Sequence, residues 1–328
     1  MSKLPLTLAC WDYDRTRALM DGRVPVDGVE LNALNLVVEE TFFRMLRHRE
    51  FDVAEMSLSS YAMTLHDNER PFIAIPIFPS RFFRHSCIYV NASSGIRAPK
   101  DLIGKRVGVP EYQMTAAVWI RGILDEHFGV PVPGVTYVTG GEEQAGRPEK
   151  SALPPEIKVE PIPHNRTLSQ MIESGEIDAL YTARMPSTFM GGSGAVRRLF
   201  PNYEQVEREY FARTGLFPIM HTVVIRRDGY ERNRWLAQSL TKAFEAAKRV
   251  ALHELAETTA LKIMLPWLTS HLENTRQALG EDYWPYGLEP NRATLETFLR
   301  YHHQQGLSKR LLKPEELFAP EALESFRI

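Results

Sequence analysis

The sequence predicts an α/β protein of two lobes with a helical C-terminal tail. Short apolar runs of strand character alternate with amphipathic helical segments, which is typical of a largely parallel sheet covered by helices. This alternation occurs twice, and after a last strand the pattern is helical to the end. We therefore expect lobe one to comprise residues 1–91 and 222–328 and lobe two to comprise residues 92–221. The ligand is expected in a cleft between them, at the carboxyl ends of strands.

The elements of lobe one follow from periodicity and from residues that begin or end helices. Asp14 is a candidate N-cap for a short helix that Gly22 ends. Phe42, Phe43 and Leu46 recur at helical spacing within a second helix. Alternating or β-branched runs predict strands. The expected strands span 4–10, 29–35, 51–55, 72–78, 87–91 and 219–226, and the expected helices span 14–21, 39–50, 232–255, 258–265, 274–279 and 292–305.

The elements of lobe two begin at a strand over 107–109 that stops at Pro110. An amphipathic helix over 115–128 follows, and a strand end that feeds a helix start leaves backbone N–H groups suited to an anion. Residues 140–155 are rich in Gly, Glu and Pro and predict a surface loop. Further strands are expected at 135–139 and 178–181, with a helix at 168–174.

The composition excludes several classes of function. The 328 residues carry a formal net charge of -2, without the basic runs of a nucleic-acid-binding protein. No apolar run approaches the roughly 20 residues of a membrane span, and the start of the chain lacks the pattern of a secretory signal, so we expect a cytoplasmic protein. Cys10 and Cys87 both lie in apolar runs and are expected to be buried thiols. No local spacing of His, Cys or carboxylates predicts a metal site.

Four polar segments follow predicted strands and lie on the expected cleft side. Hydroxyl groups beside free backbone N–H groups make a cradle for a carboxylate, although each segment taken alone could be an ordinary helix cap. The candidate substrate-binding residues in these segments are Trp11, Arg15, Ser57, Ser59, Tyr112, Thr115 and Arg184, with Glu111 beside them.

A dense group of cationic side chains precedes the strand at 87–91. Arg81, Arg84 and His85 fall within five residues, and arginine is suited to bidentate recognition of carboxylates, so we expect a dianionic ligand. The alternative is a solvated charged turn. His221 lies in an apolar run near the other expected crossing between lobes, where the alternative is a buried, hydrogen-bonded core histidine.

With these residues in view, the sequence resembles the 4,5-dihydroxyphthalate decarboxylase family over almost its whole length. The segments that carry the resemblance are 51–61, 75–91, 101–124, 216–228 and 284–310, with DLIGKRVGVP at 101–110, MTAAVWIRG at 114–122 and WPYG at 284–287. The resemblance implies a type II periplasmic-binding-protein-like fold. It also implies a carboxy-lyase of aromatic catabolism that converts 4,5-dihydroxyphthalate to 3,4-dihydroxybenzoate and CO2 without oxidation.

The chemistry of that reaction assigns expected roles. A general acid must protonate the ring carbon, and we expect His85 or His221 in this role, with Glu111 in reserve. Arg81 and Arg84 would anchor the substrate carboxylates, Arg184 would close on them, and Thr115 would hold one of them. The reaction requires no redox cofactor; participation of a divalent metal and homo-oligomer formation are left open. The alternatives are a solute-binding protein and another cytoplasmic enzyme of this fold that acts on a different small organic acid.

Overall fold

In the computed structural model, which describes residues 2–146 and 155–323, the chain forms two compact units. Unit 1 comprises residues 1–81, 219–296 and 313–328, and unit 2 comprises residues 82–218 and 297–312. The unit boundaries therefore lie at 81/82 and 218/219, rather than at the expected 91/92 and 221/222. The first boundary moves because strand β5 (Ile88–Asn91) pairs with strands of unit 2.

The sheet of unit 1 has five strands in the order β2-β1-β3-β11-β4. The parallel part is formed by β1 (Leu4–Cys10), which pairs with β2 (Val29–Asn35) and β3 (Val53–Ser57). The strand β11 (His221–Arg226) runs antiparallel to both β3 and β4 (Phe72–Ile75). The sheet is therefore mixed but largely parallel, as expected, because β11 runs against the common direction of the other four strands.

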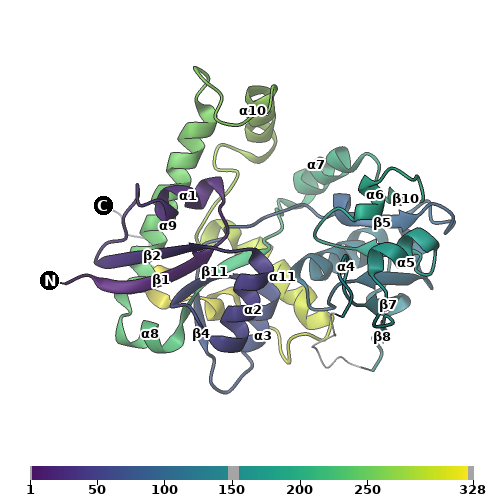
Figure 1. The fold of residues 1–328 in the computed structure, drawn as a ribbon, viewed down its shortest axis with the longest axis horizontal. Helices are drawn as coiled ribbons and strands as arrows, with labels where there is room; N and C mark the ends of the chain where they lie inside the picture. Colours follow the sequence, from purple (N-terminus) through teal and green to yellow (C-terminus); the bar gives the residue numbers. More distant parts are fainter. Residues whose placement is uncertain (1, 147–154, 324–328) are drawn as a thin grey trace. The chain divides into compact units, whose positions relative to one another are not determined.

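The helices of unit 1 are α1 (Asp14–Met20), α2 (Val38–His48), α3 (Leu58–Thr64), α8 (Arg227–Arg232), α9 (Trp235–Ala256) and α10 (Leu268–Leu279). The long helix α9 packs against α1 and extends to α10, as Figure 1 shows. The helix expected over 258–265 is absent, because these residues are exposed and a helix of that length needs a packed face to be stable. None of the helices in the described residues is long and apolar enough to cross a membrane.

The sheet of unit 2 has six strands in the order β10-β5-β9-β6-β7-β8 and is also mixed. The three strands β9 (Ala179–Tyr181), β6 (Arg106–Val109) and β7 (Thr136–Thr139) form its parallel centre together with β8 (Val159–Pro161). The strands β5 and β10 (Val196–Arg198) add an antiparallel edge. The centre of the loop expected over 140–155 lies outside the described residues.

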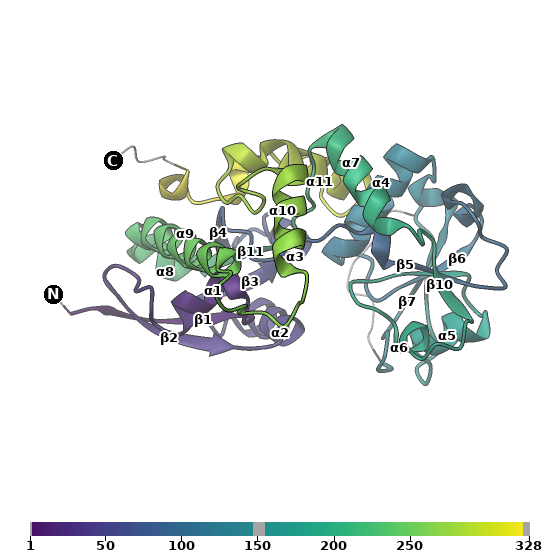
Figure 2. The same ribbon diagram turned by 90° about the horizontal axis from the view of Figure 1, so that it is seen from above.

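The helices of unit 2 are α4 (Thr115–Phe128), α5 (Leu168–Ser174), α6 (Ser187–Met190) and α7 (Tyr203–Thr214), and the last helix α11 (Arg292–Gln304) begins in unit 1 and ends in unit 2. Figure 2 shows α5 and α6 together on one side of the sheet, where the two helices contact each other. Trp119 of α4 packs against Phe298 and Tyr301 of α11, at ring-centroid distances of 5.7 Å each. This contact places part of the expected tail of lobe one in unit 2.

Candidate functional site

A carboxylate and an imidazole lie side by side at one end of the unit 1 sheet. In the register of β3 and β11, Ser57 lies opposite His221 and Glu55 lies opposite Val223. Alternate residues of a strand share a face, so the side chains of Glu55 and His221 project on the same side of the sheet. Nδ1 of His221 lies 2.6 Å from Oε1 of Glu55. Strand pairing thus builds a carboxylate–histidine pair from residues far apart in the sequence.

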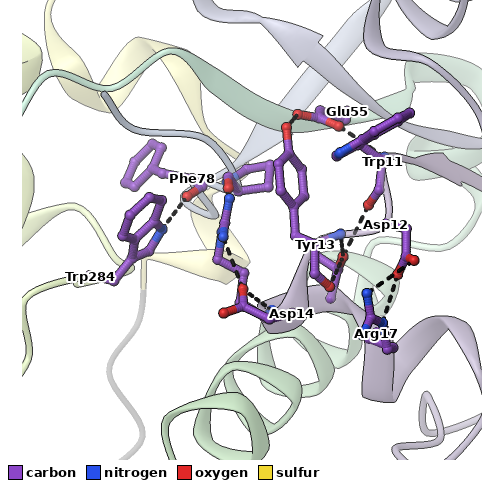
Figure 3. Close-up of polar contacts among 11 residues, drawn as sticks. Trp11, Asp12, Tyr13, Asp14, Arg17, Glu55, Phe78 and Trp284 are labelled. Atoms are coloured by element: carbon purple, nitrogen blue, oxygen red, sulfur yellow. Dashed lines mark hydrogen bonds and ion pairs between the residues drawn. The ribbon is translucent and has the colours of Figure 1, made fainter. Parts of the chain in front are cut away.

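The carboxylate of Glu55 is completely buried, and both of its oxygens accept hydrogen bonds. Oε1 also accepts from the phenol of Tyr13 at 2.7 Å, and Oε2 accepts from the backbone N–H of Trp11 at 3.1 Å and from the thiol of Cys10 at 3.6 Å. Figure 3 shows Tyr13 and Trp11 directed toward Glu55. With His221, four donors surround this carboxylate, and their hydrogen bonds offset the cost of burying its charge.

The electrostatics of the cluster keep Glu55 ionised and keep Tyr13 and Cys10 protonated. Burial by itself raises the pKa of Glu55, but the charge and hydrogen bond of His221, together with the bonds from Tyr13 and Trp11, lower that pKa below its ordinary value. Burial and the nearby Glu55 raise the pKa values of the Tyr13 phenol and the Cys10 thiol. Both groups therefore remain protonated and act as donors to the carboxylate.

His221 is the member of the cluster that can exchange a proton with a ligand. Its side chain is 16% exposed, and its Nδ1 is occupied by Glu55. The ring edge of Phe42 packs against it at 4.9 Å between centroids, which fixes the imidazole plane. Because Glu55 occupies Nδ1, Nε2 is the ring nitrogen left to meet a ligand. This geometry suits a general acid.

Arg15 adds a positive charge beside this pair. Its guanidinium lies over the ring of Tyr13 at 4.1 Å and over the ring of Trp284 at 4.3 Å. Nε donates to the carbonyl of Pro79, and Nη1 donates to Asp14 at 3.0 Å. In the described part of the chain, Nη2 of Arg15 has no hydrogen-bond partner. The arginine is therefore held rigidly, while Nη2 is left to donate to a carboxylate.

Three other expected residues of unit 1 occupy distinct positions around the cluster. The ring of Trp11 is 40% exposed, while its backbone holds Glu55. Ser57 is the N-cap of α3, where its hydroxyl accepts from the N–H of Ser60 at 3.3 Å. Ser59 is completely buried within α3. Trp11, Arg15 and His221 are thus brought together, Ser57 lies in the strand position opposite His221, and Ser59 faces the protein interior.

Arg81 lies in the interior of unit 1 and contacts the chain itself. Its Nη2 donates to the carbonyl of Pro285 at 2.7 Å and to the side chain of Asn291. Removal from water lowers the pKa of Arg81 to about 9. These contacts indicate that Arg81 supports the segment around residue 285, and its expected role as a carboxylate anchor stays a prediction.

His85 lies in an aromatic core in unit 2. It is 1% exposed and packs edge-on against Phe128, Phe200 and Tyr210 at centroid distances of 5.2–6.0 Å. Neither ring nitrogen has a hydrogen-bond partner among the described residues. Burial, with smaller effects of His127 and Arg213, lowers the pKa of His85 to about 4. A histidine that is neutral near pH 7 and enclosed by rings is poorly suited to deliver a proton, which favours His221.

The remaining expected residues of unit 2 form separate local contacts. Tyr112 is completely buried beneath the guanidinium of Arg121, at 3.8 Å, and its phenol donates to the carbonyl of Gln305 at 3.3 Å. Glu111 accepts from the Gln113 amide at 2.7 Å, so the turn before α4 is closed by its own side chains.

The other three side chains of that set differ in exposure. Thr115 is buried at the first position of α4. Arg84 is also buried, and its Nη1 donates to the carbonyl of Ala183 at 3.4 Å. Arg184 is exposed, and its backbone N–H donates to Thr182. The role of this unit 2 set in binding stays a prediction.

Sequence reasoning missed Glu55 and Tyr13 as site residues. Glu55 lies within the buried strand VAEMS, and a charged residue inside an apolar strand is a usable signal, because such a residue needs partners. The pairing of Glu55 with His221 could not be found from local sequence. Among the described residues, no group of three or more His, Cys, Asp or Glu side chains is arranged to hold a metal ion. Cys10 and Cys87 are buried and unpaired, as expected.

No protein-family model matches the chain. A 4,5-dihydroxyphthalate decarboxylase from Comamonas testosteroni is 45% identical over 330 residues, covering 100% of both chains. A protein of the same name from Pseudomonas putida is 44% identical over 213 residues, covering 64% of this chain and 83% of its own.

Solved structures of low identity support the fold alone. A putative sulfonate-binding periplasmic protein from Methylobacillus flagellatus covers 98% of this chain and 93% of its own, with a TM-score of 0.57 and 12% identity. The aliphatic sulphonate binding protein from Escherichia coli covers 98% of this chain and 99% of its own, with a TM-score of 0.54 and 12% identity. The two mixed α/β units are thus those of a type II periplasmic-binding-protein-like fold, as the sequence predicted.

Proposed function

The chain belongs to the 4,5-dihydroxyphthalate decarboxylase family, and from this premise we propose that it decarboxylates 4,5-dihydroxyphthalate with His221 as the proton donor. The products are 3,4-dihydroxybenzoate and CO2. The observation that carries the proton-donor assignment is the contact between His221 and the buried, ionised Glu55. A cytoplasmic location belongs to the proposal, and the two unpaired cysteines support it.

The proposed reaction balances with one proton taken up for each CO2 released. The hydroxyl para to the departing carboxylate donates electron density into the ring, and the imidazolium of His221 transfers its Nε2 proton to the ring carbon that bears this carboxylate. The bond from that carbon to CO2 then breaks, and its electron pair restores the aromatic ring. His221 recovers a proton from solvent before the next turnover, while Glu55 stabilises each imidazolium that forms.

The remaining side chains of the cluster have supporting roles in the proposal. Arg15 binds the carboxylate that stays on the ring through Nη2, since its Nε and Nη1 donate to the protein itself. The exposed ring of Trp11 provides an aromatic face for the substrate ring. The cluster therefore contains the proton donor and the anion-binding group that the reaction needs.

The experiment measures CO2 and 3,4-dihydroxybenzoate in single turnovers at saturating 4,5-dihydroxyphthalate. We expect His221→Gln to lower the rate about 10²–10⁴-fold, the usual contribution of a general acid, with little change in substrate affinity. His253→Gln is the matched control, because His253 is an exposed histidine on α9 of the same unit. A near-native rate for His221→Gln would remove His221 as the donor and make Glu111 the next candidate.

A further inference from the structure

The stretch WPYG at 284–287 lies beside Arg15 and has no role in the reaction as proposed above. Its first residue, Trp284, forms one side of a stack in which the Arg15 guanidinium lies 4.3 Å from the Trp284 ring and 4.1 Å from the Tyr13 ring. The indole N–H of Trp284 donates to the carbonyl of Phe78 at 3.0 Å, which fixes the plane of the ring. Figure 3 shows this bond and the positions of the Trp284 and Tyr13 rings.

Two buried cations hold the backbone of this stretch. Nζ of Lys248 donates to the carbonyl of Trp284 at 3.2 Å, and Nη2 of Arg81 donates to the carbonyl of Pro285 at 2.7 Å. Lys248 is 3% exposed and Arg81 is 4% exposed. Burying a cation is costly unless it has hydrogen-bond partners, so these two carbonyls are held where the buried cations can bond to them.

Further hydrogen bonds also hold the backbone of this stretch. The amide of Asn291 donates to the carbonyls of Pro285 and Gly287 at 3.0 and 2.7 Å. The N–H of Gly287 donates to the carbonyl of Pro76 at 2.8 Å. Gly287 has a φ of +88°, a conformation that favours glycine. The stretch is therefore a rigid support that fixes the orientation of the Trp284 indole ring.

We propose that Trp284 is a positioning residue that fixes the Arg15 guanidinium and thereby sets the preference for substrates with a second carboxylate. The inference rests on the proposed function, in which Arg15 binds the carboxylate that remains on the ring. An arginine held between two aromatic faces keeps its charge and its fork of donors in one plane, so little orientational freedom is lost when an anion binds. Trp284 itself does not contact the reacting atoms.

The test uses phthalate, which carries both carboxylates but no hydroxyls, and catechol, which carries the hydroxyls but no carboxylate. We expect Trp284→Leu to weaken phthalate binding about tenfold, the size of one lost cation–π contact, and to raise KM similarly while kcat changes little. Catechol inhibition should be unchanged. Trp284→Phe, which keeps a smaller ring, should give an intermediate effect, and it supplies the test if the leucine variant fails to fold. Trp267→Leu is the matched control, because Trp267 is 71% exposed in the same unit.

Arg15→Gln separates failure of this inference from failure of the proposed function. Unchanged phthalate binding in Arg15→Gln would overturn the anchor role itself. Weakened binding in Arg15→Gln with normal binding in Trp284→Leu would overturn only the positioning role. In the double variant, Trp284→Leu should add no further loss, since it acts through Arg15. An equal further loss in the double variant would show that Trp284 acts independently and would also overturn the inference.

Discussion

Replacement of His85 by phenylalanine should make the protein markedly less sensitive to mild acid. The imidazole lies among Phe128, Phe200 and Tyr210, and burial lowers its pKa from 6.5 to about 4. In the unfolded chain the group takes up a proton near its ordinary pKa, whereas the folded protein resists it. The stability that this neutral histidine allows is therefore present above about pH 6.5 and is lost as pH falls toward the lowered folded value.

The magnitude follows from the difference between the two pKa values. A shift of this size corresponds to about 3 kcal/mol when fully expressed, and to about 2 kcal/mol between pH 7 and pH 5. The assay is urea unfolding at these two pH values, followed by circular dichroism. His85→Phe should lose about 2 kcal/mol less than the native chain over this interval, because a phenyl ring fits the aromatic surroundings and cannot be protonated.

The control for this experiment is His164→Gln, which alters an exposed histidine of the same unit. His85→Phe should also retain decarboxylation near neutral pH, since His221 is the proposed donor. An unchanged dependence of the unfolding free energy on pH in His85→Phe would refute the reasoning, because it would show that this histidine is not held neutral by its surroundings.

Two further predictions concern the carboxylate of the site and a close packing contact. Glu55→Gln keeps the shape of the side chain but removes its charge, so kcat should fall about 10²-fold. The ionised Glu55 stabilises the folded protein above its ordinary pKa, and this stability is lost as pH falls through the lowered pKa of the folded state, so the variant should not show this loss. Rates and urea unfolding at about pH 4 and pH 7 check both parts, and a native rate would contradict the first. Gly122→Ala should cost about 1–3 kcal/mol in urea unfolding, because a Cβ at this position would lie 2.1 Å from the Tyr301 ring; an unchanged midpoint would show that α4 and α11 can separate freely.

The sequence predicted those helices and strands that are determined by nearby residues. The helix Thr115–Phe128 has the expected bounds, because its periodicity is strong and Gly129 ends it in a left-handed conformation. The helix expected over 258–265 failed because an amphipathic pattern is stable only where its apolar face finds a partner. The strands β8 and β10 have three residues each, which is too short for alternation to be recognised.

The candidate site could be predicted only in part for a related reason. His221 was found because it lies near an expected crossing of the chain between lobes, and Arg15 because it follows the first strand. Glu55 and Trp284 were not found, because Glu55 pairs with His221, which lies 166 residues away in the sequence, and Trp284 packs against the distant Arg15. Which side chains meet across a sheet depends on register, and register is a property of the assembled fold.

Because residues 297–312 belong to unit 2, this unit can be completed only late in synthesis. Trp119 and Gly122 present a face of α4 that stays uncovered until Phe298 and Tyr301 have emerged, more than 170 residues later. A ribosome releases these residues many seconds after α4, so the nascent chain exposes an apolar stripe for that interval. For the same reason, a fragment that comprises residues 82–218 lacks part of its own interior. A gene fusion that joins residues 297–312 to this fragment would supply all of unit 2.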